Sequence, residues 1–249
     1  MLRQLYSDEN YRCEELAVRS PDRCFVELDV LSRIQRQLRG GRILDVGCGA
    51  GHFLACAKQS GFEGCGIEVA SHSAQFARTS YDLKVAPSLE TLGEPAESFD
   101  VVTLIGVIEH IQQPLQFLRA VQQFVKPNGF VFILTDNHRS WMHWLMKERF
   151  PWIIPPEHLQ LFSPRAISVL FEQSGLQLIE ISSKETIFRD AAVRGFAKLT
   201  GNNPLVKWIG KFAAGPLLFL TYPIRRLLWE AKLGAQIYCM AQKPPAQPS

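Results

Sequence analysis

The chain has 249 residues, of which 47% are hydrophobic and 20% are charged, and this length is enough to bury a full hydrophobic core. The apolar share excludes a disordered chain, and no Gly-X-Y or heptad repeat indicates a fibrous one. The 27 basic and 24 acidic side chains leave a formal net charge of only +3, without a long basic run. We therefore expect no nucleic-acid partner.

Cysteine usage and the apolar stretches of the chain bear on its location. The six cysteines include no C-x-x-C pair, which favours reduced thiols over a disulfide framework. Residues 1–16 show no apolar signal-peptide core. The uncharged stretch Phe212–Ile224 would span about 20 Å as a helix, which is shorter than the roughly 30 Å core of a bilayer. We expect a cytoplasmic protein, with peripheral membrane contact as an open alternative.

Apolar runs typical of strands alternate with amphipathic runs typical of helices in the first two thirds of the chain. A first helix is expected from Ser20 to about Leu38, ending at a glycine pair. The strands expected after it are Arg42–Val46, Gly64–Glu68, Lys84–Ala86, Phe99–Ile105 and Phe130–Leu134. The helices expected between them are Phe53–Gln59, Ser71–Ser80 and Pro114–Val125, and Lys126–Gly129 is expected to be a turn.

The last third predicts a helix at Ser163–Ser174 and strands at Leu176–Ser182 and Ala235–Ala241. The connection between these two strands is too long for a simple loop, so residues 184–234 are expected to form a helical insertion. Apolar strands that alternate with helices predict an α/β protein whose parallel sheet is covered on both faces.

A glycine-rich loop follows the first predicted strand. Residues 45–51 read Asp-Val-Gly-Cys-Gly-Ala-Gly, and glycines at such a strand-to-helix turn let the backbone approach a ligand closely. The G-x-G-x-G spacing differs from the dinucleotide fingerprint, and no Lys-Ser/Thr pair of a phosphate-binding loop follows. Asp45 would repel a pyrophosphate and attract a cationic ligand. Glu68, at the end of the second strand, stands where a carboxylate can accept both hydroxyls of a ribose.

These segments resemble a known family when they are taken together. ILDVGCGAGHF, GIEVA, SFDVVTLIGVIEHIQQP and VKPNGFVFI, in this order and spacing, resemble class I S-adenosylmethionine-dependent methyltransferases. The nearest branch contains ubiquinone-biosynthesis O-methyltransferases and other small-molecule enzymes. The resemblance covers about Leu38 to Leu178. It implies a Rossmann-like, doubly wound, mostly parallel seven-stranded sheet with an antiparallel last strand.

The resemblance also assigns the cofactor, S-adenosyl-L-methionine, and its contacts. Gly47, Cys48 and Gly49 would line the methionine part of the cofactor, with Asp45 near its amino group. Glu68 would hold the ribose, and Ile105, ending the fourth strand, would contribute backbone beside the cofactor.

Methyl transfer to a hydroxyl requires a group that removes a proton, and histidine suits this role near neutral pH. His110 follows Glu109 directly after the fourth strand, and His158 lies in the segment Pro-Pro-Glu-His-Leu. Each is a candidate base, and the alternative for each is a histidine that braces its loop. His138 and His143 are expected to be ordinary surface or loop residues. No cluster of His, Cys, Asp or Glu has metal-ligand spacing, so no metal is expected.

The expected organisation is a single methyltransferase domain over residues 1–249, with an N-terminal helical segment at 1–40 and a cofactor-binding core at 41–136. The aromatic segment 137–162 is expected to cover a substrate pocket; the alternative is a satellite core. Trp208–Trp229 has an apolar centre with basic residues at its margins, which is typical of an interfacial element. The alternatives there are a packed helical pair and a homodimer contact.

The sequence favours an enzyme that methylates a hydroxyl oxygen of a small or lipid-linked molecule. Transfer to carbon or nitrogen on the same fold is an alternative, and so is a cofactor-binding partner protein without turnover.

Overall fold

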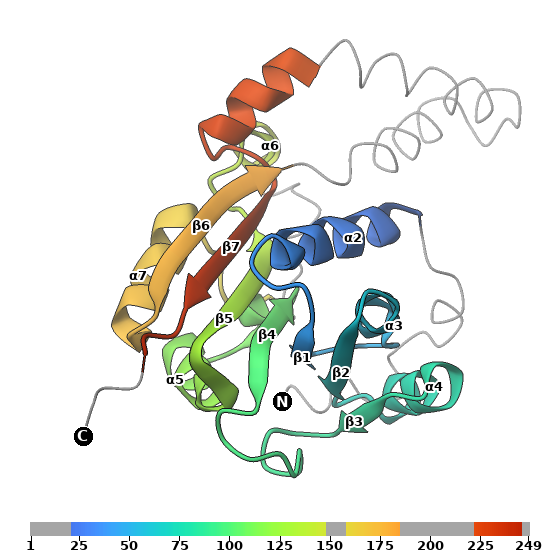
Figure 1. Ribbon diagram of the computed structural model, residues 1–249. Helices are drawn as coiled ribbons and strands as arrows, with labels where there is room; N and C mark the ends of the chain where they lie inside the picture. The colour runs from blue at the N-terminus through green and yellow to red at the C-terminus, as the bar shows by residue number, and fades with distance from the viewer. Residues whose placement is uncertain (1–20, 148–157, 185–221, 246–249) are drawn as a thin grey trace, which may run out of the picture.

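The computed structural model describes residues 21–147, 158–184 and 222–245 (Figure 1). The expected aromatic lid at 137–162 and the helical insertion at 184–234 lie partly outside these ranges. The apolar centre of the Trp208–Trp229 element lies wholly outside them, and these domain boundaries therefore remain predictions. Within the described part of the chain, no helix is both long and apolar enough to span a bilayer.

A seven-stranded sheet forms the centre of the molecule, in the order β3-β2-β1-β4-β5-β7-β6 (Figure 1). The strands are β1 (Gly41–Val46), β2 (Phe62–Ile67), β3 (Lys84–Ala86), β4 (Phe99–Ile105), β5 (Val125–Asp136), β6 (Gln177–Lys184) and β7 (Gln236–Gln242). The pairs among β1 to β5 are parallel, and β7 is antiparallel to both of its neighbours, β5 and β6. The expected doubly wound sheet with an antiparallel last strand is confirmed.

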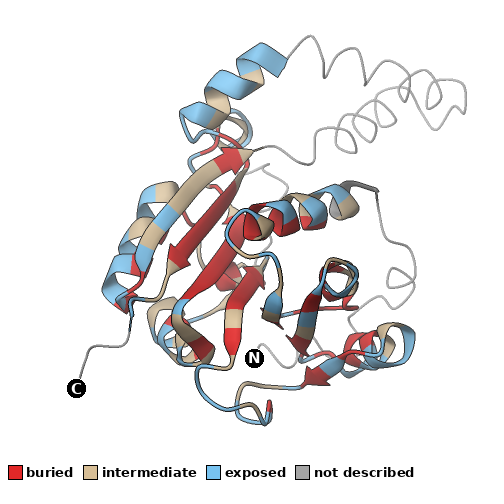
Figure 2. Cartoon of the chain, viewed as in Figure 1, coloured by how far each residue is buried: buried red, intermediate tan, exposed pale blue. Residues whose placement is uncertain are grey.

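Helices cover both faces of the sheet because alternate side chains of each buried strand point to opposite faces. One apolar cluster packs against α5 (Pro114–Val121) and α7 (Pro164–Ser174). The other packs against α2 (Pro21–Gln35), α3 (His52–Gln59) and α4 (Ser71–Tyr81). Figure 2 shows the buried residues concentrated in the strands and on the helix faces turned toward them.

The expected turn at Lys126–Gly129 is wrong. The helix expected to reach Val125 ends at Val121, a short 3-10 helix η3 (Gln122–Phe124) follows, and β5 already begins at Val125. The pairing of β5 with β4 shifts register between Phe99 and Val101, so the four residues form an irregularity inside the strand. Within this irregularity, Lys126 Nζ lies 2.9 Å from the Asp100 carboxylate on β4. This contact between neighbouring strands cannot be inferred from the turn-forming residues of the segment.

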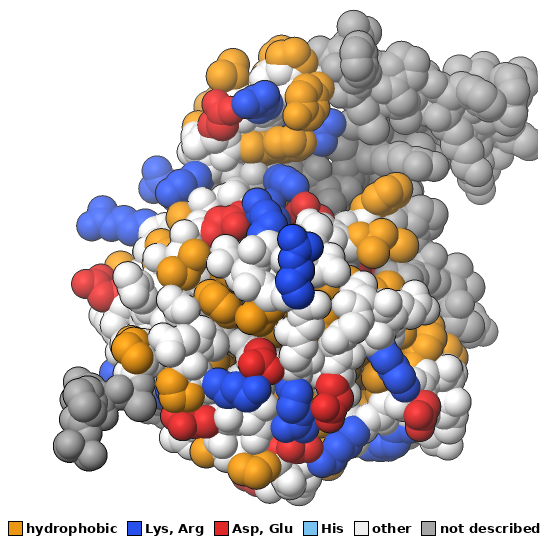
Figure 3. Space-filling view, in the orientation of Figure 1, with side chains coloured by type: hydrophobic (Ala, Val, Ile, Leu, Met, Phe, Trp, Pro, Cys, Tyr) orange, Lys and Arg blue, Asp and Glu red, His pale blue; other side chains and the backbone are white. Residues whose placement is uncertain are grey.

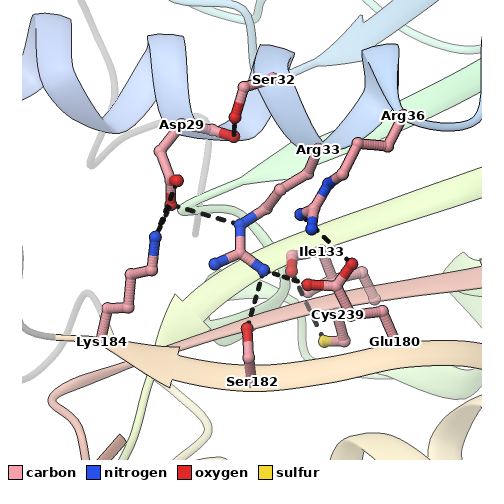
Figure 4. A network of polar contacts seen from close by, with 9 residues as sticks. All are labelled: Asp29, Ser32, Arg33, Arg36, Ile133, Glu180, Ser182, Lys184 and Cys239. Atoms are coloured by element: carbon pink, nitrogen blue, oxygen red, sulfur yellow. Dashed lines mark hydrogen bonds and ion pairs between the residues drawn. The ribbon is translucent and has the colours of Figure 1, made fainter. Parts of the chain in front are cut away.

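Helix α2 is held against β6 and β7 by a network of charged side chains (Figure 4). The side chain of Arg33 is only 5% exposed and bonds the carboxylates of Asp29 and Glu180. Arg33 also donates to Ser182 Oγ at 2.8 Å, and its guanidinium lies 4.7 Å from the ring centroid of Tyr238. This network joins the N-terminal helix to the far end of the chain.

We expect Arg33→Met to lower the free energy of unfolding by about 1–3 kcal/mol, because the partly buried Glu180 then keeps only the exposed Arg36 as a cation, although Asp29 still bonds Lys184 at 2.8 Å. The matched control is Arg36→Met, since Arg36 bonds the same Glu180 at 3.4 Å but its side chain is 58% exposed. That control should cost less than about 0.5 kcal/mol. Urea unfolding of both variants measures the difference, and equal losses would show that burial of Arg33 is irrelevant.

Candidate active site

The glycine loop lies at the carboxyl edge of the parallel strands, between β1 and α3. Gly47, Gly49 and Gly51 all have positive φ angles, of 76°, 53° and 79°, which residues other than glycine rarely adopt. The amides of Gly47 and Cys48 donate to the carbonyl of Ile67 at 2.8 and 3.0 Å, so the loop is tied to the end of β2. A Cβ at Gly47 would meet Val107 Cγ2 at 2.5 Å. The loop thus leaves room only for backbone at this point.

Two buried acids stand beside this loop. Glu68 accepts the Gly49 amide with Oε2 and the Ala70 amide with Oε1, both at 2.8 Å. A carboxylate has about four acceptor positions, so Glu68 can hold the loop and still accept hydroxyls of a ribose. Asp45 accepts a hydrogen bond from Thr103 Oγ1 at 2.6 Å. Both acids occur where the sequence predicts them, and the support of the loop by Glu68 is an additional role.

Cys48 is buried in the same loop. Burial, with the charges of Asp45 and Glu68, raises the pKa of its thiol well above its usual range, so the thiol stays neutral. The side chain contributes packing next to β2: a Cβ at Gly66 would meet Cys48 Sγ at 2.5 Å. Any contact of Cys48 with a cofactor would therefore be made through its backbone or an uncharged thiol.

The end of β4 joins the glycine loop to a second group of residues. Ile105 is half-buried, and Gly106 follows it with φ 68° and an amide that donates to Leu134 in β5 at 2.8 Å. Val107 then faces Gly47, and the short helix η2 (Ile108–His110) follows directly. The predicted contacts at Gly47 and Ile105 therefore lie at the same sheet edge as the candidate base His110.

A pocket beside η2 gathers imidazole and carboxyl groups. It is lined by Glu109, Thr135, Asp136, His138, His143, His158, Gln160 and Leu161, and we call it the histidine pocket. The rings of His110 and His158 meet edge-on with centroids 4.8 Å apart. The two candidate bases, which are 48 positions apart in the chain, thus lie side by side.

The expectation that His138 and His143 are surface or loop residues is confirmed for His138, which lies in a turn, and is wrong for His143, which lies half-buried in α6 (Trp141–Met146). Both line the histidine pocket, and their ring centroids lie 5.5 Å apart. Burial, with His143 and Arg139 nearby, lowers the pKa of His138. The local sequence contained one usable signal: Asp136 and His138 come directly at the end of a buried strand, at the edge where ligands of parallel sheets bind.

Two carboxyl groups share the histidine pocket. Glu109 is buried and accepts a hydrogen bond from Thr135 Oγ1 at 2.9 Å. Burial of the Asp136 side chain and the nearby charge of Glu109 together raise the pKa of Asp136 to about 8. His158 Nδ1 lies 3.8 Å from Asp136 Oδ2.

This raised pKa makes the folded state bind more protons than the unfolded state between pH 3.8 and about 8. The free energy of unfolding should therefore fall as pH rises through that window. We expect Asp136→Asn to remove this loss and to be more stable than the parent at pH 9 by a few kcal/mol, with a smaller difference at pH 5. Denaturant unfolding at both pH values measures it, and a pH-independent difference would contradict the burial of the charge.

Glu109, His110 and His158 each place one ligand atom within 4.8 Å of the others. Two imidazoles and a carboxylate are a set that can bind a transition metal. Local spacing indicated no such set, because the third member comes from a distant segment that only the fold brings to η2. The lack of metal-ligand spacing in the sequence therefore does not exclude a metal at these residues, and the expectation of no metal stays a prediction.

A sheet of this order, with a glycine loop after β1 and an acid after β2, defines the class of α/β domains that bind a nucleoside-type cofactor at the carboxyl edge. A family model described as a methyltransferase domain matches residues 19–181. The chain therefore belongs to this methyltransferase family.

Curated relatives carry the name ubiquinone biosynthesis O-methyltransferase. The one from Bordetella avium is 33% identical over 119 residues, which are 45% of this chain and 49% of that protein. The one from Neisseria meningitidis is 30% identical over 159 residues, covering 57% of this chain and 66% of that protein. The match thus spans about half to two thirds of the length of these relatives.

Solved structures share the fold. Phosphoethanolamine N-methyltransferase 2 of Haemonchus contortus, solved with S-adenosyl-L-methionine, has a TM-score of 0.65 and 20% identity, covering 97% of this chain and 58% of that chain. A possible histamine N-methyltransferase from Thermotoga maritima has a TM-score of 0.57 and 17% identity, covering 87% and 89% of the two chains.

Proposed function

We propose that the protein transfers a methyl group from S-adenosyl-L-methionine to a hydroxyl oxygen of a small or lipid-linked acceptor. One observation carries the proposal: the glycine loop and the histidine pocket meet at one sheet edge, where Val107 faces Gly47 and η2 begins one residue later. The curated relatives named as O-methyltransferases support the choice of oxygen.

The residues fit this cofactor. Positive-φ glycines leave backbone at the place where a methionine chain would lie, and the Glu68 carboxylate retains acceptor positions for a ribose. The cofactor supplies a methyl group that is already activated on a sulfonium, so the protein has to align the acceptor and exclude water. The contact between the His110 and His158 rings supports the proposal that one of these histidines removes the proton of the hydroxyl.

The test is methyl transfer to matched probes. Purified protein is incubated with labelled S-adenosyl-L-methionine and with catechol, 3,4-dihydroxybenzoate or the corresponding aromatic amines. We expect label on oxygen, and a loss of roughly 10²-fold or more in kcat for a variant that lacks the responsible histidine. His72→Asn is the control, because His72 is exposed on α4. Label on amines only would favour N-methylation, and binding without transfer would favour a partner protein without turnover.

We further propose peripheral contact with an anionic membrane through the Trp208–Trp229 element. Its described end is a helix at residues 222–230, where Ile224 and Leu227 are 63% and 66% exposed. Figure 3 shows hydrophobic and basic side chains together over this helix at the top of the view. Arg225 and Arg226 lie between the two apolar residues, an arrangement that suits a negatively charged lipid surface.

Vesicle binding tests this contact. Each Lys or Arg near an anionic surface contributes about 1 kcal/mol, so co-sedimentation with phosphatidylserine vesicles should occur at low salt and weaken at high salt. Replacing Leu217, Leu218 and Phe219, which lie outside the described residues, with serine should abolish it, while S-adenosylhomocysteine affinity stays unchanged. A parent that does not sediment at low salt would instead favour a packed cover or a homodimer contact.

A further inference from the structure

Asp136 and His158 form a carboxyl–imidazole pair inside the histidine pocket. Asp136 is the last residue of β5, and His158 lies in the segment that leads to α7. Their side chains are only 17% and 10% exposed, and Oδ2 lies 3.8 Å from Nδ1. Catalytic hydrogen bonds are often this long before substrate binds and shorten in the reactive complex.

The backbone around this pair is held by several independent contacts. The amides of Leu159 and Gln160 donate to the carbonyl of Glu109 at 2.9 and 3.0 Å, which fixes the chain directly after His158. On the other side, Asn137 forms a bridge with Phe162, and its Nδ2 donates to the carbonyl of Gly234 at 2.7 Å. The approach of Asp136 to His158 is therefore a built feature of the fold.

The surroundings of Asp136 give it no evident structural benefit. The titratable groups lining the pocket with it are Glu109 and three histidines, and none of the pocket-lining residues is a lysine or arginine. A carboxyl group buried beside another carboxyl group costs stability, and such costs are typical of functional positions. Asp100 provides the contrast, because its carboxylate bonds the Arg42 amide at 2.8 Å and Lys126 Nζ at 2.9 Å.

We propose that Asp136 is a positioning residue that orients His158 as the proton acceptor of methyl transfer. When Asp136 is ionised, Nδ1–H of His158 donates to its carboxylate, which fixes the tautomer whose Nε2 carries a lone pair. Because burial raises the pKa of Asp136 to about 8, the ionised form predominates above that pH, and the measurements below are made there. This inference rests on the proposed function, O-methylation.

The step balances as follows. The acceptor oxygen forms a bond to the methyl carbon, the sulfur–carbon bond breaks, and its electron pair remains on sulfur. The hydroxyl proton moves to Nε2 of His158, and the Asp136 carboxylate stabilises the resulting imidazolium until the proton leaves to solvent. The His110 ring packs edge-on against the His158 ring, with centroids 4.8 Å apart.

The test compares Asp136→Asn, Asp136→Glu, His158→Asn and the double variant Asp136→Asn/His158→Asn, with 3,4-dihydroxybenzoate as acceptor. We expect Asp136→Asn to lower kcat by about tenfold or more, while KM for the acceptor and S-adenosylhomocysteine affinity stay within about twofold. Asp136→Glu should recover part of kcat. The double variant should be no slower than His158→Asn, because the two residues act as one unit.

Asp100→Asn is the matched control, since Asp100 is also a strand carboxylate of similar exposure, 25%, and lies at the opposite edge of the sheet. Asp100→Asn should lose stability and keep kcat, whereas Asp136→Asn should lose kcat without losing stability, and should gain stability at pH 9. Parent-like kcat in Asp136→Asn, or losses that multiply in the double variant, would overturn the pair.

A second measurement does not depend on turnover. Nitrogen-15 NMR of the His158 ring should show the proton on Nδ1 in the parent and a changed tautomer ratio in Asp136→Asn. A parent that methylates none of the hydroxyl probes would refute O-methylation. In that case, unchanged His158 ring shifts in Asp136→Asn would refute the pair as well, and changed shifts would retain the orientation of His158 by Asp136.

Discussion

Gly47→Val is expected to abolish binding of S-adenosylhomocysteine in calorimetry. The native φ of 76° is one that a β-branched residue scarcely adopts, and the new Cβ would stand 2.5 Å from Val107 Cγ2. Relief of that contact must move either the glycine loop or the chain that leads into η2, and both line the proposed cofactor site. The sequence alone predicts a largely intact fold for this variant; the strained φ and the contact with Val107 instead predict a loss of stability of about 1–3 kcal/mol as well.

A control separates backbone strain from loss of the site. Gly175 caps the C-terminus of α7 with φ 83°. A Cβ added at Gly175 would have no other atom within 4 Å, apart from those of its chain neighbours. Gly175→Val should therefore lose comparable stability and retain parent-like affinity for S-adenosylhomocysteine. Unchanged affinity in Gly47→Val would overturn the assignment of the glycine loop to the cofactor.

Glu68→Ala should weaken S-adenosylhomocysteine binding by roughly 1.5–3 kcal/mol, the usual range for a hydrogen bond to a charged group, or about 10–150-fold. Two effects combine: the carboxylate no longer accepts the Gly49 and Ala70 amides, and the acceptor for the ribose is removed. Glu68→Gln should cost less, because its amide oxygen can still accept one backbone N–H.

A 2′-deoxy analogue of S-adenosylhomocysteine separates these two effects. If Glu68 holds the ribose, the parent should bind the analogue more weakly than S-adenosylhomocysteine, whereas Glu68→Ala should bind the two ligands equally well. Equal losses in both proteins would mean that Glu68 acts only through the loop. Parent-like binding by Glu68→Ala and Glu68→Gln would place the ribose contact elsewhere.

The order of strands and helices was predictable because its causes are local. The run of mostly apolar, buried residues in Phe99–Ile105 and the serine and proline at the start of α7 are signals contained within a few residues of chain. The same holds for the glycine loop, since a positive φ at Gly47 is a property of that residue and its turn. The expected turn at Lys126–Gly129 failed because a contact with a neighbouring strand, through Asp100, overrode the local turn preference.

The amino-acid sequence by itself therefore determined the α/β fold, the family and the positions of Asp45, Gly47 and Glu68 at the ends of their strands. Only the tertiary structure decided that His138 and His143 line a pocket with His158, and that Glu180 on β6 anchors Arg33 of α2. The physical reason is distance along the chain. No local pattern records which loops meet at a sheet edge, because that meeting depends on strand order and on side-chain packing between segments far apart in sequence.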